Sequence, residues 1–197
     1  QPKPVVWKKV KTPGFGVARN LRFGDVNGDG KLEFVIGQMN AHGPHDAYSE
    51  VGCITAMTFD GEMLWQSGTP DPARTALTND VGFQVHDIDG DGRAEVIYCR
   101  DFELCIADGL TGKVRSKVPT PESKPPANRD PRILGDCLFF CDVSGKGRPT
   151  DILIKDRYWH FWIYNDRLQP LWSGDCRTGH YPFAFDNDGD GLDEMAI

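Results

Sequence analysis

The feature that most constrains the fold is an acidic, glycine-rich segment that occurs four times along the chain. The four copies begin at Asp25, Asp87, Asp142 and Asp186, at intervals of 44 to 62 residues. Each copy follows a short apolar run and precedes a run rich in β-branched residues, such as that at 34–36. Self-similarity at intervals of this length predicts a repeat protein, in which each unit is one supersecondary motif.

Each complete unit contains two more apolar runs with a turn between them. The turns lie at Asp60-Gly61, Asp108-Gly109 and Asn165-Asp166, where small polar residues favour a tight reversal between antiparallel strands. The segment from Val5 to Trp7 is expected to be the fourth strand of a preceding unit. Four short strands joined by turns form a meander, and packed meanders form a β-propeller. We therefore expect an all-β fold, a β-propeller of four-stranded antiparallel blades.

The repeats also predict how the chain is organised. We expect residues 1–197 to form a single propeller domain or a fragment of one, with approximate repeats at 13–68, 78–118, 133–174 and 178–197. The last repeat ends in its second strand, so about three and a half blades are present and the ring is incomplete in this chain. Because a propeller needs about four to eight blades, the remaining ones are expected from a longer chain or a second chain.

Three of the acidic segments carry oxygen ligands at positions 1, 3, 5 and 9 and a backbone carbonyl at position 7. Six or so oxygens on a tight loop suit Ca²⁺, so we expect three calcium sites. An EF-hand is excluded because its position 12 needs a glutamate between two helices, and these segments carry Ile36, Tyr98 and Ile197 there. The alternative is that the Asp and Gly residues only form turns. The expected ligands are Asp25, Asn27, Asp29, Lys31 and Glu33; Asp87, Asp89, Asp91, Arg93 and Glu95; and Asp186, Asp188, Asp190, Leu192 and Glu194.

The third segment departs from this pattern. Asp142, Ser144 and Lys146 occupy positions 1, 3 and 5, and the next acid, Asp151, comes one residue late. We expect the ammonium of Lys146 to lie where a metal would sit, and no calcium there.

The charge balance excludes some classes of partner. The chain has 29 acidic and 22 basic residues, a formal net charge of −7, which three calcium ions would largely neutralise. Such a chain is not expected to bind nucleic acid, and it has no apolar run long enough to span a membrane. Six cysteines without a CxxC pair make a zinc site unexpected; Cys99 and Cys105, which flank a short turn, are the one disulfide considered.

The motifs resemble those of a known family. The segments DVNGDGKLE, DIDGDGRAE and DNDGDGLDE, each between two strands, resemble FG-GAP or VCBS repeats, the calcium-binding blades of integrin α-subunits and of many bacterial secreted proteins. With His and Tyr residues beside the inner strands, the chain is also similar to bacterial rhamnogalacturonan lyases and related polysaccharide lyases. That resemblance implies a calcium-containing propeller that cleaves uronate-containing chains by β-elimination. It implies no catalytic motif residue by residue.

Strands alternate direction within a blade, so a glycan site is expected on the face opposite to the acidic loops. Counting back from each first aspartate places Asn20, Val81 and Asp136 around a central channel on that face. The base, the acid and the carboxylate clamp of β-elimination are expected to be His180, Tyr181 and Arg19. The expected substrate-binding residues are His42, His45, Tyr48, Arg100, Lys155, Arg157 and Tyr158. For each of them the alternative is a structural role, such as an ion pair or a satisfied rim histidine.

Two functions remain after these steps. The first is a secreted polysaccharide lyase that cleaves a uronic-acid-containing, rhamnogalacturonan-like glycan. The second is a non-catalytic FG-GAP propeller that binds glycan or protein at a cell surface. Calcium sites of this type fill readily at extracellular calcium levels, so either protein is expected to be secreted, extracellular or periplasmic.

Overall fold

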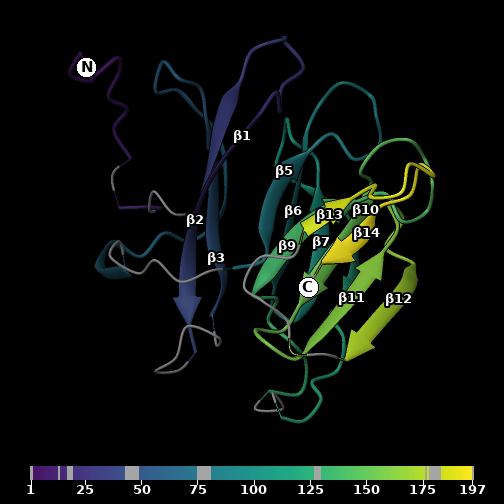
Figure 1. Cartoon of the computed structure of the whole chain (residues 1–197). Coiled ribbons are helices and arrows are strands. Elements are labelled where there is room, and N and C mark those ends of the chain that lie inside the picture. The colour runs from purple at the N-terminus through teal and green to yellow at the C-terminus, as the bar shows by residue number, and fades with distance from the viewer. Residues whose placement is uncertain are drawn as a thin grey trace.

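A computed structural model of the chain describes residues 2–12, 14–16, 20–42, 49–74, 81–126, 130–175, 177 and 183–196 (Figure 1). The fold is all-β. The first sheet contains β1 (Leu21–Gly24), β2 (Glu33–Ala41), β3 (Ser49–Met57) and β4 (Met63–Gly68), and the second contains β5 (Phe83–His86), β6 (Glu95–Arg100), β7 (Glu103–Ala107) and β8 (Val114–Pro119). The third contains β9 (Cys137–Cys141), β10 (Asp151–Lys155), β11 (His160–Tyr164) and β12 (Pro170–Asp175), and a last pair consists of β13 (Phe183–Phe185) and β14 (Glu194–Ala196). A 3-10 turn, Pro72–Arg74, follows β4.

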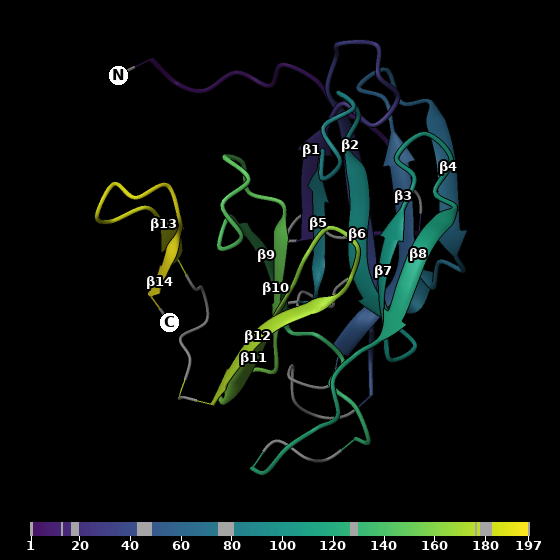
Figure 2. The same ribbon diagram turned by 90° about the vertical axis from the view of Figure 1, so that its right-hand side faces the viewer.

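Every sheet is an antiparallel meander, because strands that follow one another in the sequence are also neighbours in the sheet. The expected four-stranded antiparallel units are therefore confirmed. The expected turns are also confirmed, since Asp60-Gly61, Asp108-Gly109 and Asn165-Asp166 connect the third and fourth strands of their sheets. The strand expected at Val5 to Trp7 is wrong: this segment is irregular and exposed, and the ring of Trp7 lies 5.7 Å from that of Phe59, beside the turn after β3 (Figure 2). Among the described residues the sheets form no closed ring.

The sheets are stacked face to face, with their first strands side by side. β1 contacts β5, β5 contacts β9, and β9 contacts β13, so the first strands follow one another through the stack (Figure 2). The acidic segments connect the first and second strands of each sheet, and all of them therefore lie at one end of the stack. The opposite end carries the connections between second and third strands and those between sheets.

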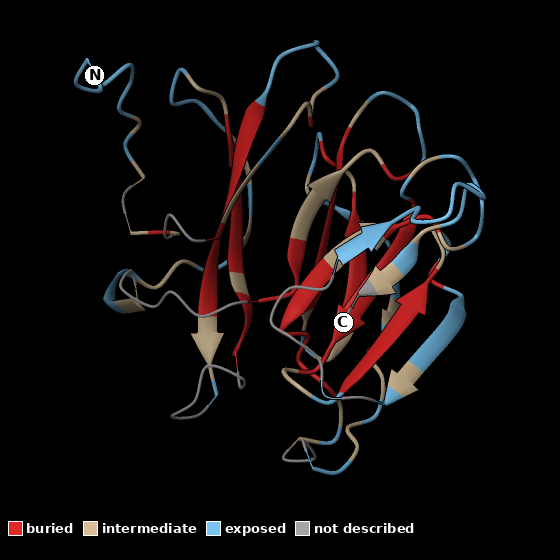
Figure 3. Ribbon diagram, viewed as in Figure 1, coloured by how far each residue is buried: buried red, intermediate tan, exposed pale blue. Residues whose placement is uncertain are grey.

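Two hydrophobic cores fill the spaces between the three sheets. In β6 the side chains alternate, so that Val96 and Tyr98 join the core against the first sheet while Ile97 and Cys99 join the core against the third. The middle strands of each sheet are buried and the fourth strands are exposed (Figure 3). Cys105 belongs to the first of these cores, on the other face of the sheet from Cys99. Both are free thiols, and the disulfide considered between them is wrong.

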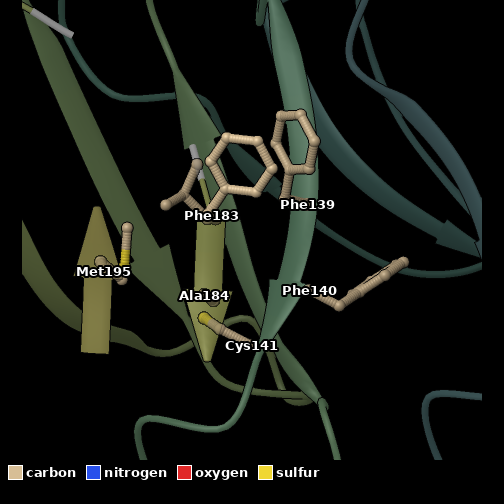
Figure 4. Close-up of a pocket in the computed structure, with 7 residues that line it drawn as sticks. Phe139, Phe140, Cys141, Phe183, Ala184 and Met195 are labelled. Atoms are coloured by element: carbon tan, nitrogen blue, oxygen red, sulfur yellow. The ribbon is translucent and has the colours of Figure 1, made fainter. Parts of the chain in front are cut away.

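A third space, between the third sheet and the β13–β14 pair, is only partly filled. It forms a cavity of about 490 Å³, with Phe139 on β9 and Phe183 on β13 among its lining residues (Figure 4). The described lining is mostly apolar and includes Met195 of β14. Within the described residues, no helix is long and apolar enough to cross a bilayer.

Candidate functional site

The acidic segments close on themselves by hydrogen bonds to their first aspartate. In the second segment, Asp87 accepts hydrogen bonds from the backbone N–H groups of Gly90 (2.6 Å) and Gly92 (3.1 Å). Both glycines have positive φ angles, 81° and 90°, which residues with a side chain rarely adopt. The first and fourth segments repeat this pattern around Asp25 and Asp186. The glycines therefore bring the acidic side chains of each segment to one side of a tight loop.

Two of the loops bring carboxylate oxygens close enough together to hold a metal ion. The ligand atoms of Asp87, Asp89 and Glu95 lie within 4.8 Å of one another, as do those of Asp186, Asp188 and Glu194. Burial raises the pKa of Glu95 to about 7, and the nearby charge of Asp89 adds to this effect. A buried carboxylate beside other carboxylates is stabilised by a cation, so the donor set fits a metal ion that prefers oxygen ligands.

The first loop differs because its position 3 is an amide. Asn27 donates a hydrogen bond of 3.2 Å to Glu33, while its side-chain oxygen accepts one from the backbone N–H of Asp29. Burial raises the pKa of Glu33, as it does for Glu95. Asn27 and Glu33 are therefore adjacent, but the carboxylates of this loop are not clustered as closely as those of the second and fourth loops.

The second loop is contacted by a residue that the sequence motifs did not indicate. The guanidinium of Arg115, on β8, donates to Glu95 and to Asp89, with both distances 2.7 Å. Arg115 thus places a cation against two of the three clustered carboxylates. No motif marks this contact, because it joins the acidic loop to the outermost strand of the same sheet.

The third loop is held by protein groups. Asp151 is fully buried and accepts hydrogen bonds from the backbone N–H and the hydroxyl of Ser144, at 2.8 and 2.9 Å. The expectation for Lys146 is wrong. Its ammonium points to Asp166 on the turn between β11 and β12, at 2.9 Å, rather than into the loop.

Neighbouring acidic loops are tied to one another. The N–H of Ala94, at position 8 of the second loop, donates to the carbonyl of Asp25, at position 1 of the first (2.8 Å), and Asp193 donates in the same way to Asp142 (3.0 Å). Between the second and third loops this bond cannot form, because position 8 is Pro149, which lacks an N–H. The guanidinium of Arg148 replaces it and donates to the carbonyls of Asp87 (3.3 Å) and Ile88 (3.1 Å).

On the opposite face, the structure brings the expected inner-strand entrances together. Asn20, Val81 and Asp136, which belong to three successive sheets, line one cavity of about 80 Å³. Polar side chains connect the strands beneath it, since Arg22 donates to Gln84 (2.7 Å) and Gln84 donates to the carbonyl of Leu138 (3.0 Å). Polar and apolar side chains thus both line the space between the first strands at this end of the stack.

The expected catalytic and substrate-binding residues have different surroundings. The three catalytic residues, Arg19, His180 and Tyr181, and two of the substrate-binding ones, His45 and Tyr48, lie outside the described residues. Arg157 pairs with Asp136 at 3.4 Å, and its guanidinium carbon lies 5.0 Å from the ring centre of Tyr158. Lys155 is fully buried on β10, and this burial lowers the pKa of its ammonium.

Two further expected residues, His42 and Arg100, lie at the seam between the first and second sheets. The Nε2 atom of His42 lies 2.6 Å from Glu50, and the other oxygen of Glu50 accepts a hydrogen bond of 2.7 Å from the N–H of Asp101. Arg100, which directly precedes Asp101, donates a hydrogen bond of 3.3 Å to the hydroxyl of Ser67 on β4. Sequence analysis missed Glu50, although an acidic residue within an apolar strand is a signal that it has a specific partner.

Similarity to known proteins supports the resemblance to rhamnogalacturonan lyases. The chain is 32% identical to the rhamnogalacturonan exolyase YesX of Bacillus subtilis, over 90% of this chain and 37% of YesX. It is 34% identical to the rhamnogalacturonan endolyase YesW of the same organism, over 49% of this chain and 16% of YesW. The chain therefore matches little more than a third of the length of YesX and about a sixth of that of YesW. No family model matches it.

Two solved structures share the fold. A Bacillus licheniformis rhamnogalacturonan lyase PL11 superposes with a TM-score of 0.58 and 20% identity, over 96% of this chain and 42% of that one. The Vibrio cholerae biofilm matrix protein Bap1 superposes with a TM-score of 0.54 and 23% identity, over 89% of this chain and 27% of that one. At these identities the likeness concerns the fold alone.

Proposed function

We propose that this chain is part of a calcium-stabilised β-propeller enzyme, a polysaccharide lyase that cleaves a uronic-acid-containing glycan of the rhamnogalacturonan type. The observation that carries the proposal is the 32% identity, over 90% of the chain, to a protein named as a rhamnogalacturonan exolyase. We further propose that the protein is secreted, because weak calcium sites would fill outside the cytosol.

The stacking of the sheets supports the propeller. Successive first strands lie side by side and their entrances meet at one polar cavity, as they would around a propeller axis. In this proposal further blades, from a longer chain or a second chain, close the ring next to the β13–β14 pair.

Three calcium ions form the second part of the proposal, one in each of the first, second and fourth acidic loops. The carboxylate clusters of the second and fourth loops support it. Each loop is hydrogen-bonded to its neighbour, so an ion that makes one loop rigid would also stabilise the contact between two sheets. In this proposal the ions lie at the opposite end of the stack from the glycan.

The polar face opposite to these loops supports the chemistry. In β-elimination a base takes the C5 proton of the uronate, the C4–O4 bond breaks, a C4=C5 double bond forms, and the leaving oxygen receives a proton. A cation beside the carboxylate lowers the barrier, and Arg100 and Arg157 are both held in place on this face. Arg19, His180 and Tyr181 remain predictions for it.

The test measures the conjugated product of elimination. The complete protein, loaded with calcium, is incubated with rhamnogalacturonan, and the rise in ultraviolet absorbance from the unsaturated uronate is followed. A neutral glycan without uronate serves as the control substrate. Rising absorbance with rhamnogalacturonan alone supports the lyase. Tight binding without a rise in absorbance would instead support the non-catalytic propeller.

A further inference from the structure

We propose that Trp172, on the exposed strand β12, binds the turn of a β-hairpin that follows β14 in the complete protein, and that this turn carries glycine where the indole meets it. The inference rests on the propeller proposed above and specifies how the sheet begun by β13 and β14 is completed. The observation that carries it is the contact that Trp65, at the same position of the first sheet, makes with the second sheet.

Trp65 and Trp172 occupy the same place in their sheets. Trp65 pairs with Ala56 of β3, Trp172 pairs with Ile163 of β11, and in both sheets the strand register shifts directly after this pair. Residues that pair across two strands have their side chains on the same face of the sheet. Ala56 belongs to the core shared with the second sheet, and Ile163 belongs to a cluster packed against Met195 of β14. Both tryptophans therefore lie on the face towards the following sheet.

Trp65 binds the turn between β7 and β8. Its indole N–H donates to the carbonyl of Gly109, at 2.7 Å. Gly109 has no room for a side chain, because a Cβ there would overlap the carbonyl oxygen of Ala94. Gly112 has a φ of 68° and lies against the indole, so that a Cβ would be 2.5 Å from the ring of Trp65. The indole thus requires a turn with glycine at both positions.

The second sheet shows the other combination. Its residue at this position is Ser116, which pairs with Ile106 just before the register shift of that sheet. The turn of the third sheet, which follows, carries Leu168, 3% exposed and part of the core between these two sheets. A small residue on the fourth strand therefore goes with a bulky residue in the next turn, and a tryptophan goes with glycine. Trp172 is expected to select a turn of the glycine kind.

The β13–β14 pair lies against the third sheet as β5 and β6 lie against the first. The N–H of Ala94 donates to the carbonyl of Asp25 (2.8 Å), and the N–H of Asp193, at the same position of the last loop, donates to the carbonyl of Asp142 (3.0 Å). Because the two junctions share this bond, a hairpin that follows β14 would bring its turn to Trp172, as β7 and β8 bring theirs to Trp65.

The described residues leave this position of the third sheet exposed. Leu64 and Trp65 are partly buried against the core between the first two sheets. Leu171 and Trp172, at the same two positions, are 44% and 55% exposed (Figure 3). The indole of Trp172 contacts only its own sheet in the described interactions, with its ring 5.2 Å from that of Phe161. The missing contact is therefore the one that the turn makes at Trp65.

The experiment measures hydrogen exchange of the indole N–H groups in the complete protein, labelled with ¹⁵N-tryptophan. Trp65 is the protected reference and Trp7, which is 80% exposed, is the unprotected one. Trp65→Phe and Trp172→Phe each remove one signal and so assign it. We expect the N–H of Trp172 to exchange about 100-fold or more slowly than that of Trp7, because a hydrogen bond closed by packing must open first.

The same variants test stability. Trp65→Phe and Trp172→Phe keep an aromatic ring but leave a turn carbonyl without its donor, so each should lower the melting temperature by about 2–8 °C. Trp159→Phe, on the turn between β10 and β11, is the matched control, because Trp159 is 37% exposed and belongs to neither junction. Its melting temperature should change by about 1 °C or less.

Three results would overturn the inference: exchange of the Trp172 N–H as fast as that of Trp7, protection that is lost on dilution, and a structure of the complete protein with a bulky residue against the indole. The second would mean that another copy of the chain covers Trp172. None of these measurements uses activity. A protein without lyase activity would refute the proposed reaction, and the exchange of Trp172 would still decide what covers β12.

Discussion

The guanidinium of Arg115 lies against the carboxylate of Glu95, with 2.7 Å between donor and acceptor, inside the second acidic loop. Glu95 is 2% exposed, and burial raises its pKa to about 7. Its negative charge is therefore stabilised by a protein cation at the place where we propose a calcium ion. Two cations compete for one set of oxygens, and this competition can be measured.

Arg115→Gln should tighten calcium binding to the second loop and destabilise the metal-free protein. The first effect arises because calcium no longer displaces a cation, and the second because Glu95 and Asp89 lose their partner. The side chain of Arg115 is 43% exposed, so we expect a modest gain in affinity, of about threefold to tenfold. Calorimetric titration and melting in chelator test the two effects. Weaker calcium binding in the variant would show that Arg115 supports the site.

Asp89→Ala should lower the melting temperature in calcium without weakening glycan binding. Removing one oxygen of the cluster should cost about 1–3 kcal/mol of the free energy of unfolding when calcium is present. In chelator the variant should lose much less, about 0–1 kcal/mol, because it gives up only the partly exposed pair of Asp89 with Arg115. Glycan affinity should stay constant because the loops lie at the opposite end of the stack. Lost affinity at unchanged stability would mean that calcium itself binds the glycan.

The fold was predictable from the sequence because its signals are local. The turn at Asp60-Gly61 and the acidic loop at Asp87 each depend on residues a few positions apart, and both occur where expected. The absence of a strand at Val5 to Trp7 was not predictable, because an apolar run becomes a strand only when a sheet edge accepts it. Whether Cys99 and Cys105 can form a disulfide likewise depends on which face of the sheet each side chain occupies.

The site was harder to predict because its contacts join distant parts of the chain. Sequence analysis named His42 and Arg100 separately, but the carboxylate that connects their strands, Glu50, stands within a strand and belongs to no motif. Arg115 was missed for the same reason. Lys146 was assigned to its own loop, whereas an acid on the neighbouring turn, Asp166, holds it. Side-chain partners across a sheet follow from strand register, which the repeat pattern does not supply.

The buried ammonium of Lys155 predicts a pH dependence of stability. Burial lowers its pKa below the ordinary 10.5, although the charges of Asp136 and Asp156 oppose this shift. A lowered pKa means that the charged form is penalised in the folded state. This penalty is complete below the folded-state pKa and disappears as pH rises towards 10.5. Over that alkaline range, wild-type stability should therefore rise relative to Lys155→Met. Urea unfolding at several pH values measures the difference, and a constant difference would contradict the prediction.

Arg148 should be essential for the contact between the second and third acidic loops. At the other two junctions a backbone N–H makes this contact, from Ala94 to Asp25 and from Asp193 to Asp142. Pro149 removes that donor here, so the guanidinium of Arg148 alone supplies the described hydrogen bonds to the carbonyls of Asp87 and Ile88.

Arg148→Met should therefore destabilise the protein by about 1–3 kcal/mol, since it keeps the apolar stem but leaves two carbonyls without their donor. Lys146→Met, in the same loop, is the matched control. Its ammonium pairs with Asp166 within the third sheet, and losing a partly exposed pair should cost about 0–1 kcal/mol. Chemical unfolding measures both, and amide exchange in β5 and β6 should accelerate only in the Arg148 variant. Equal effects of the two substitutions would show that Pro149 breaks the junction and that Arg148 does not restore it.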